Sequence, residues 1–277
     1  MSTLTENPTI GIVIPAAGRG TRAGEGCQKA YRRIGGDTVL NRVLKLFRSW
    51  NTHFPIVIVH HGDDTSLLEA SIDRDSNIHT TTEGVKRQAS VLHGLRFLSS
   101  LPKSPSHVFI HDAARPFASH TLLNNVLESL IKEPLTGVIP VIAVSDTLKK
   151  TDSNGLIKAT VPRDGLFRTQ TPQEFTLQTI LYLHERAATS ASLYTDNASL
   201  LEEAGPPVRI VQGDSQNIKL TLRCTAANLL SSMTTDSDVT CGIGADTIII
   251  PSVDDYFNLM NNGNIDFGLV GSWFVRK

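Results

Sequence analysis

Residues 10–29 read IGIVIPAAGRGTRAGEGCQK. The unbroken apolar run Ile10–Ile14 predicts a strand that is buried on both faces, as in a parallel sheet. Small residues after this run allow the backbone to close tightly, and the N–H groups of such a turn can line up on an anion. Arg22 and Lys29 add two cations close to the same strand end. The stretch therefore predicts a site for a polyphosphate at the end of the first strand.

The loop after this strand partly matches two well-known phosphate-binding motifs. Gly18–Ala23 satisfies the dinucleotide-binding fingerprint with Ala in third place, which is a weak match on its own. That fingerprint needs an acidic residue at the end of the second strand, but the next apolar run, Ile56–Val59, arrives late and ends in two histidines. A Walker P-loop is excluded because no Gly-Lys-Ser/Thr follows. If the loop is considered alone, it can also be interpreted as an ordinary glycine turn flanked by surface cations, and this alternative stays open.

Composition favours a soluble protein of a reducing compartment. The chain has 277 residues and a net charge of −1, so it has no global basic field for nucleic acid. Cys27, Cys224 and Cys241 are far apart and lack ligand spacing, which is typical of free thiols. We find neither a signal-peptide pattern at the N-terminus nor an apolar run near the ~20 residues of a membrane span. We therefore expect a cytoplasmic protein that binds neither nucleic acid nor membranes.

Strand-like apolar runs alternate with helical periodicity over most of the chain. Strands are predicted at Ile56–Val59, Val108–Ile110, Gly137–Val144 and Val208–Val211, and helices around Val39–Phe47, Ser90–Leu98 and Leu122–Ile131. This alternation predicts an α/β fold with a Rossmann-like, mainly parallel sheet that is covered by helices on both faces. Ligands of such sheets bind at the carboxyl ends of the strands, so residues just after each run are candidate site residues.

Two segments interrupt the alternation. From about Val141 to Val161, β-rich residues flank Thr151–Gly155, whose turn chemistry predicts a projecting β-hairpin arm. The apolar residues of this arm are Val141, Ile142, Val144 and Leu148. A monomer would leave them in water, so we expect a homodimer through residues 141–161. A polar stretch after Leu230 predicts a domain over residues 1–230 and a linker with a short C-terminal segment of unknown role over 231–277.

Four further motifs stand at the expected ends of elements. They are His111–Pro116, Asp146–Lys149, Arg163 with Thr171–Gln173, and Thr195–Ser199 with Asn217–Thr221. Taken in this order with the first loop, the chain resembles the 2-C-methyl-D-erythritol 4-phosphate cytidylyltransferases of the non-mevalonate isoprenoid pathway, over roughly residues 9–222. The run His-Asp-Ala-Ala-Arg-Pro favours methylerythritol phosphate over ribitol phosphate, because the related ribitol-phosphate enzymes usually differ there.

The resemblance implies that CMP passes from CTP to 2-C-methyl-D-erythritol 4-phosphate, giving CDP-methylerythritol and pyrophosphate, with Mg²⁺ as the cofactor. The substrate phosphate attacks the α-phosphorus of CTP directly, so catalysis is mostly positioning and charge neutralisation. Arg22 and Lys29 match the family's loop cations, and Asp112 can reach Mg²⁺ or substrate hydroxyls. The other matches are Arg163 and Lys219 on the methylerythritol phosphate, Arg115, Thr171 and Thr195 as substrate contacts, and Ala16, Ala17, Gly18, Gly20, Gly84 and Ser90 in the CTP wall.

Each of these residues also has a structural alternative. Asp112 could cap the helix near Ser119, and Thr195–Asp196 could cap the helix that follows it. Arg163 and Lys219 could be solvated surface charges.

The chain departs from the family pattern at three places. Gln28-Lys29-Ala30 stands for the usual Pro-Lys-Gln, Asn197 for an acidic residue, and Arg223–Ala226 for Pro-Glu-Asp-Leu. Two functional alternatives therefore stay open: a cytidylyltransferase for another polyol phosphate such as ribitol phosphate, and a catalytically weakened nucleotide-binding relative. Retention of every cation named above favours the active enzyme.

The C-terminal segment carries a faint second similarity. In some bacteria the enzyme of the family that this chain resembles is fused to the pathway's cyclase, and Cys241–Asp246 is similar to the opening strand of that cyclase. The cyclase's zinc site needs Asp-x-His there and another His later, but position 248 is Ile and no histidine follows His184. We therefore expect no cyclase activity. A truncated form of the fusion, or an extra strand-helix unit that packs on the domain or on a partner, stays open.

Overall fold

The computed structural model describes residues 8–18, 29–34, 36–72, 75–84, 87–132, 137–189, 194 and 196–220, and the backbone of four later strands. The helices are α1 (Val39–Trp50), α2 (Thr65–Glu69), α3 (Arg87–Ser100), α4 (His120–Lys132), α5 (Leu177–Ala188) and α6 (Ala198–Ala204), with short 3-10 turns η2 (Lys29–Tyr31) and η3 (Gly62–Asp64). The strands up to residue 220 are β1 (Ile10–Pro15), β2 (Arg33–Ile34), β3 (Asp37–Thr38), β4 (Ile56–His60), β5 (Ile78–Thr82), β6 (His107–Ile110), β7 (Gly137–Ala143), β8 (Leu148–Thr151), β9 (Ile157–Val161), β10 (Phe167–Thr169), β11 (Gln173–Thr176) and β12 (Val208–Gln212).

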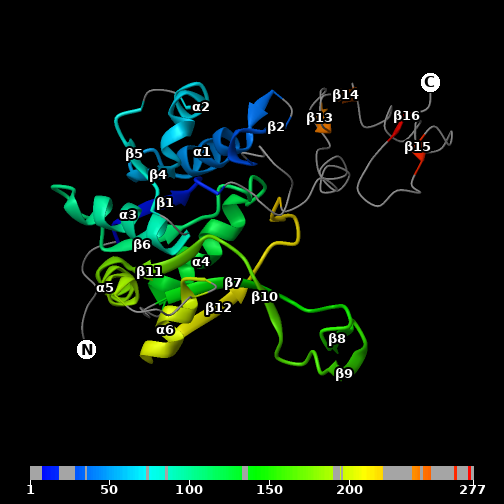
Figure 1. Cartoon of the computed structure of the whole chain (residues 1–277). Coiled ribbons are helices and arrows are strands. Elements are labelled where there is room, and N and C mark those ends of the chain that lie inside the picture. The colour runs from blue at the N-terminus through cyan, green and yellow to red at the C-terminus, as the bar shows by residue number, and fades with distance from the viewer. Residues whose placement is uncertain are drawn as a thin grey trace.

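An eight-stranded sheet forms the centre of the fold (Figure 1). Seven of its strands follow the order β10-β7-β11-β6-β1-β4-β5, and β12 pairs with β7. β1 runs parallel to β4 and β6, β4 runs parallel to β5, and β12 runs parallel to β7. Only β10 and β11 run antiparallel to their neighbours within this sheet. The predicted mainly parallel α/β fold is therefore confirmed.

Helices cover both faces of the sheet, and β1 divides its side chains between them. Ile10, Ile12 and Ile14 are buried in one core with residues of α1, α2 and α4. Val13 points to the opposite core, which α3, α5 and α6 fill. Alternate residues of a strand point to opposite faces, so a strand with no polar position must be buried on both. The unbroken apolar run of β1 is therefore the sequence signature of a central strand.

The predicted arm is present as a β-hairpin. β8 and β9 pair antiparallel outside the central sheet and project from it, and the chain returns through β10 (Figure 1). Asp152 Oδ1 accepts hydrogen bonds from the backbone N–H groups of Asn154 and Leu156, and Gly155 takes a φ of 81°. This left-handed conformation favours glycine, so the turn residues predicted from the sequence close the hairpin.

One detail of the predicted arm is wrong. Val141 is buried in β7, inside the central sheet, because it pairs with both β10 and β12. The three most exposed apolar side chains of the arm lie further out or on its returning strand: Leu156 at 66%, Ile157 at 67% and Phe167 at 45%. The arm thus begins after Ala143, and its apolar surface is centred on the hairpin turn and the return path.

The sequence patterns missed several strands because those strands are polar. β5 reads IHTTT and lies at the edge of the sheet, where partial exposure permits polar residues. β11 reads QEFT yet is almost fully buried, since Glu174 is paired with His107 at 2.8 Å. A buried strand whose polar side chains find partners on a neighbouring strand has no apolar run that would reveal it in the sequence.

The remaining strands lie after residue 238. β13 (Val239–Ile243) pairs with β14 (Asp246–Ile250), and β15 (Ile265–Asp266) pairs with β16 (Phe274–Val275), each antiparallel. The other residues of 221–277 lie outside the described part of the chain, so the predicted boundary near residue 230 stays a prediction. None of the helices in the described ranges has the length and apolar character needed to cross a bilayer.

Candidate active site

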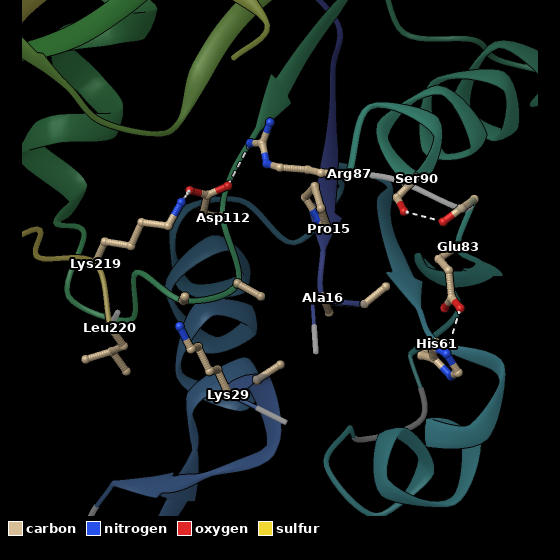
Figure 2. Close-up of a pocket in the computed structure, with 16 residues that line it drawn as sticks. Pro15, Ala16, Lys29, His61, Glu83, Arg87, Ser90, Asp112, Lys219 and Leu220 are labelled. Atoms are coloured by element: carbon tan, nitrogen blue, oxygen red, sulfur yellow. Dashed lines mark hydrogen bonds and ion pairs between the residues drawn. The ribbon is translucent and has the colours of Figure 1, made fainter. Parts of the chain in front are cut away.

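A pocket of about 610 Å³ opens at the carboxyl ends of the central strands (Figure 2). Its walls come from segments that follow β1, β4, β5 and β6, together with η2, the first turn of α3 and the end of the loop after β12. The lining residues are Pro15, Ala16, Ala17, Gly18, Lys29, Ala30, His61, Glu83, Gly84, Arg87, Ser90, Asp112, Ala113, Ala114, Lys219 and Leu220. A cavity of this size is typical of a small-ligand site.

Small residues at the end of β1 form the floor of the pocket. Ala16 N–H donates to the carbonyl of Val59 at 2.7 Å, which continues the β1–β4 ladder to the pocket edge. Ala17 and Gly18 follow without side chains long enough to fill the space. Lys29 lies in η2 and lines the same space. The backbone can therefore approach a ligand closely beside a cation.

Asp112 carries the central carboxylate of the pocket. Its Oδ1 lies 2.8 Å from Arg87 Nη2, and its Oδ2 lies 2.6 Å from Lys219 Nζ (Figure 2). Burial alone would raise the pKa of Asp112, but the charges of Arg87 and Lys219 lower it well below its usual value. The side chain is thus an anion at neutral pH, and it fixes two cations from opposite parts of the chain.

The hydroxyl of Thr171 holds the backbone of Asp112 in place. It accepts the Asp112 N–H at 3.0 Å and lies 3.2 Å from Nδ1 of His111. The other ring nitrogen, Nε2, lies 3.0 Å from the carbonyl of Arg115, which can only accept. His111 therefore carries its proton on Nε2, and the Thr171 hydroxyl donates to Nδ1. The two hydrogen bonds of this buried hydroxyl, to Asp112 N–H and to His111 Nδ1, both hold the loop that carries Asp112.

Burial keeps His111 neutral. The side chain is fully enclosed, and this burial lowers the pKa of His111 to about 4. A neutral ring is the form that can both accept from Thr171 and donate to Arg115.

Arg115 connects its own loop to the loop of Asn217 and to the end of β10. Its Nη1 donates to the carbonyl of Asn217 at 2.7 Å, and its Nη2 donates to the carbonyl of Thr169 at 3.3 Å. Asn217 Nδ2 donates in turn to the carbonyl of Thr171 at 2.8 Å, and Leu220 N–H donates to the carbonyl of Ala114 at 2.8 Å. These bonds dock residues 213–220 onto the Asp112 loop, which is why Lys219 reaches Asp112.

The opposite end of the pocket follows β4 and β5. His61 Nε2 lies 3.1 Å from Glu83 Oε1, and the hydroxyl of Ser90 lies 3.5 Å from the carbonyl of Gly84 (Figure 2). A Cβ at Gly84 would come within 2.3 Å of the Cβ of Ala89, so only glycine fits this turn. The loop from β5 into α3 is therefore tightly packed beside the pocket.

The structure brings most of the predicted site residues together. Ala16, Ala17, Gly18, Lys29, Gly84, Ser90, Asp112 and Lys219 all line the pocket. Gly20, Arg22 and Thr195 lie outside the described residues. Arg115, Thr171 and Arg163 are not among the lining residues: the first two are hydrogen-bonded within the supporting loops, and Arg163 lies after β9 on the arm, where it donates to the carbonyl of Ser145.

The sequence assigned no role to four residues at the site, although Asn217 belongs to the motif Asn217–Thr221. Arg87, His61 and Glu83 line the pocket, and Asn217 connects two of its loops. Because β5 was missed, Glu83 and Arg87 were not recognised as residues between a strand end and a helix start. The signal available for His61 was its position just after the predicted strand Ile56–Val59.

The structure decides three of the structural alternatives. Asp112 does not cap α4: the hydroxyl of Ser119 accepts the Leu122 N–H instead. Asp196 does act as a cap, because its Oδ1 accepts the backbone N–H of Ser199 at 3.0 Å. Lys219 is an ion-paired pocket residue rather than a solvated charge.

The departure at Asn197 is well accommodated. Its side chain is buried, and its Nδ2 donates to Oε1 of Gln173 at 2.8 Å. Gln173 Nε2 donates in turn to Oδ2 of Asp196 at 3.3 Å. An acidic residue at position 197 could not donate to this oxygen, so Asn and Gln173 form a matched pair. Position 197 therefore gives no sign of a damaged site.

The described residues supply little of a metal site. No group of three or more His, Cys, Asp or Glu side chains within them could enclose a metal ion. Asp112 is the carboxylate predicted to bind Mg²⁺, and each of its oxygens keeps a lone pair beside its ion pair. Mg²⁺ at phosphate-transfer sites is commonly held by one or two carboxylates together with substrate phosphates. Asp112 fits that mode as a single ligand.

Comparison with known proteins identifies the family. A family model described as IspD, 2-C-methyl-D-erythritol 4-phosphate cytidylyltransferase, matches residues 10–231. A bifunctional enzyme IspD/IspF of Rhizobium etli is 47% identical over 221 residues, which are 78% of this chain and 54% of that protein. The bifunctional enzyme of Agrobacterium fabrum is 44% identical over 220 residues, with 77% and 54% covered. The chain thus spans about half the length of the curated relatives it matches.

Solved structures agree with this match. A 4-diphosphocytidyl-2C-methyl-D-erythritol synthase from Anaerococcus prevotii superposes with a TM-score of 0.66 at 28% identity, covering 78% of this chain and 94% of that one. The 2-C-methyl-D-erythritol 4-phosphate cytidylyltransferase of Thermus thermophilus gives a TM-score of 0.61 at 30% identity, with 76% and 92% covered. With a family model that matches well over half of its residues, this chain belongs to the IspD family of 2-C-methyl-D-erythritol 4-phosphate cytidylyltransferases.

Proposed function

We propose that this chain transfers CMP from CTP to 2-C-methyl-D-erythritol 4-phosphate, the reaction after which its family is named, in isoprenoid precursor biosynthesis. The observation that carries the proposal is the pocket itself: Lys29 and Lys219 line it together with the small residues that follow β1. Anionic substrates need cations and close backbone N–H groups, and the family membership supplies their identity.

The chemistry needs no covalent intermediate. A phosphate oxygen of the polyol phosphate forms a bond to the α-phosphorus of CTP, and the bond from that phosphorus to the bridging β-phosphate oxygen breaks, so that pyrophosphate leaves with the electron pair. Lys29 and the predicted loop cation Arg22 stabilise the charge that develops on the α-phosphate and on the leaving group. Lys219 holds the incoming phosphate in line, because its ammonium group is fixed beside Asp112.

Mg²⁺ is the cofactor that we propose. Asp112 would supply one ligand of the ion, and the triphosphate would supply most of the others. Arg87 and Lys219 already balance the charge of Asp112, so this carboxylate alone would hold the ion weakly. When bound, the ion neutralises phosphate charge. The proposal predicts that a chelator abolishes turnover and that added Mg²⁺ restores it.

We also propose a homodimer through the arm. The support is the exposed apolar surface at Leu156, Ile157 and Phe167, which a second copy would cover. Arg163 lies on the same arm and outside the pocket of its own chain, so its predicted contact with the polyol phosphate requires a second copy. Mixing inactive Lys29→Ala and Arg163→Ala chains tests this arrangement, because statistical pairing would restore about a quarter of the wild-type activity. No recovery contradicts it.

We also propose a cytoplasmic location, which the three widely spaced cysteines support. The two small-molecule partners that we propose are CTP and a polyol phosphate, and the net charge of −1 gives no support for nucleic-acid binding.

Pyrophosphate release tests the proposed reaction directly. The chain is incubated with CTP, Mg²⁺ and either methylerythritol phosphate or ribitol phosphate, and the nucleotide product is identified by ³¹P NMR. Release with methylerythritol phosphate supports the proposal. Pyrophosphate release with ribitol phosphate alone would identify the chain as a ribitol-phosphate cytidylyltransferase. CTP binding without pyrophosphate release from either substrate would indicate a nucleotide-binding relative.

A further inference from the structure

The pocket has two ends of opposite chemical character. At the end of β6, Lys219 and Arg87 surround Asp112; at the ends of β4 and β5, His61 and Glu83 form a separate pair (Figure 2). The strand order β6-β1-β4-β5 places the end of β1 between these two groups. A ligand that lies across β1 therefore meets cations on one side and a carboxylate on the other.

His61 fixes the orientation of the Glu83 carboxylate. The backbone N–H of Asp63 lies 3.1 Å from Nδ1 of His61, and a backbone N–H can only donate, so Nδ1 accepts and Nε2 carries the proton. Nε2 then donates to Oε1 of Glu83 at 3.1 Å. The highly exposed Asp63 carboxylate is a more distant neighbour of Nδ1, at 3.4 Å.

The backbone of Glu83 is held just as firmly. Its N–H donates to the carbonyl of His60 at 2.8 Å, which extends the β4–β5 ladder by one residue. Gly84, which follows, packs so tightly against Ala89 that it admits no side chain. The carboxylate thus projects from a rigid turn.

The second oxygen of this carboxylate has no partner within the described part of the chain. Glu83 Oε2 is buried, yet it accepts no hydrogen bond there. A buried carboxylate oxygen without a donor is unfavourable, so it is suited to accept one from a ligand. Since Glu83 lines the pocket, the donor it lacks is one that a bound molecule can bring.

Charge decides which part of the nucleotide reaches Glu83. A carboxylate repels phosphate, whereas Lys29 and Lys219 attract it, so the triphosphate belongs on the cationic side and the base on the side of Glu83. Cytosine carries an exocyclic amine that donates hydrogen bonds. Uracil carries a carbonyl oxygen at the same position, which would meet the carboxylate as a second acceptor.

Building on the proposed cytidylyl transfer, we infer that Glu83, held by His61, is a specificity-determining residue that accepts a hydrogen bond from the amine of cytosine and so selects CTP over UTP. A site built to pair with a particular polar group discriminates strongly against analogues that lack it, since its own buried group is then left unpaired. Ser90 and Gly84 lie beside Glu83 and complete this wall of the pocket.

The test compares nucleotide preference in the wild type and in Glu83→Gln. The carboxamide is nearly isosteric but can also donate, so we expect the ratio of kcat/KM for CTP to that for UTP to fall by roughly tenfold or more. His61→Ala, which only releases the carboxylate, should reduce the ratio less. Glu128→Gln, on the exposed surface of α4, is the matched control and should leave the ratio unchanged.

Calorimetric titration with CTP, UTP and dCTP, without the polyol phosphate, separates the outcomes. Loss of CTP preference over UTP in Glu83→Gln supports the inference. An unchanged CTP/UTP ratio overturns it, as does an effect confined to the CTP/dCTP ratio, which would assign Glu83 to the ribose. If the wild-type chain binds no nucleotide, the proposed function fails together with this inference; normal CTP turnover with an unaltered ratio in the variant defeats this inference alone.

Discussion

The hydroxyl of Thr171 accepts the backbone N–H of Asp112 across 59 positions of the sequence, at 3.0 Å. It also donates to Nδ1 of His111, so both of its hydrogen bonds are used inside the protein. The predicted substrate contact at Thr171 is thereby replaced by a different hypothesis, in which this residue positions the loop of Asp112.

Substitution of Thr171 distinguishes these two roles. Thr171→Val should lower kcat roughly tenfold or more with little change in KM for methylerythritol phosphate, because a displaced Asp112 loop misaligns the reacting groups. Thr171→Ser keeps the hydroxyl and should restore most of kcat. A direct contact with the polyol phosphate would instead raise KM in the valine variant, and steady-state kinetics would show it.

The loop cations should matter most at the transition state. Lys29→Ala and Arg22→Ala are each expected to lower kcat by roughly 10²–10³, because their charges act when charge develops on the phosphates. Lys132→Ala removes an exposed lysine of α4 and serves as the control. Wild-type turnover in either loop variant would show that the phosphates bind elsewhere.

Asp112→Asn should weaken both stability and catalysis. The substitution leaves Arg87 and Lys219 without their anion, and we expect a loss of about 1–3 kcal/mol in unfolding free energy at neutral pH, since both cations are partly exposed. The lowered pKa of Asp112 means that its contribution is present above the usual carboxylate pKa and is lost as pH falls below it. Urea unfolding should therefore show the difference between variant and wild type shrinking below about pH 4.

Two buried histidines predict a separate loss of stability at mildly acidic pH. Burial lowers the pKa of both His111 and His184 from 6.5 to about 4. Their neutral forms favour the folded state, so stability is complete above about pH 6.5 and falls as the pH drops toward 4, by at most about 3 kcal/mol for each group. Urea unfolding between pH 7 and pH 4 measures this slope.

The matched variants for that slope are His184→Gln and His53→Gln. The first removes a buried group and should flatten the curve, whereas the second changes an exposed histidine and should not. Equal slopes in all three proteins would mean that the His184 ring does not resist protonation.

The arm should control the oligomeric state. Replacing Leu156 and Ile157 by Ser is expected to convert a dimer to a monomer at micromolar concentration, because it removes apolar surface that a second copy would cover. Ile131→Ser changes a comparably exposed residue of α4 and should leave the dimer intact. Light scattering gives the mass of each variant, and a wild-type monomer would contradict the proposal at once.

The fold could be predicted from the sequence where the buried positions of a strand or helix are occupied by apolar residues. β1, β4, β6 and β7 all have apolar runs, and α1 and α4 carry clear stripes. β11 could not be found this way, because its buried Glu174 is paired through Oε1 with His107, a residue 67 positions earlier. Such long-range pairing leaves no local pattern in the sequence.

The site was predictable to a similar extent. Resemblance identified Lys29, Asp112 and Lys219, whose residue types are typical of phosphate chemistry, and the structure gathers them in one pocket. The resemblance could not reveal that Arg115 donates its hydrogen bonds to backbone carbonyls, since those partners come close only in the folded chain. The same holds for Glu83, whose unpaired oxygen is a property of packing rather than of residue type.

The separation of Asp112 and Lys219 matters for the chain as it is made. Lys219 lies 107 residues after its partner, so at ribosomal speeds it is synthesised roughly 5 to 20 s later. Arg87 lies 25 residues before Asp112, so it is synthesised before its partner. Until Lys219 is made, Arg87 is the one of these two ion-pair partners that the growing chain can offer to Asp112.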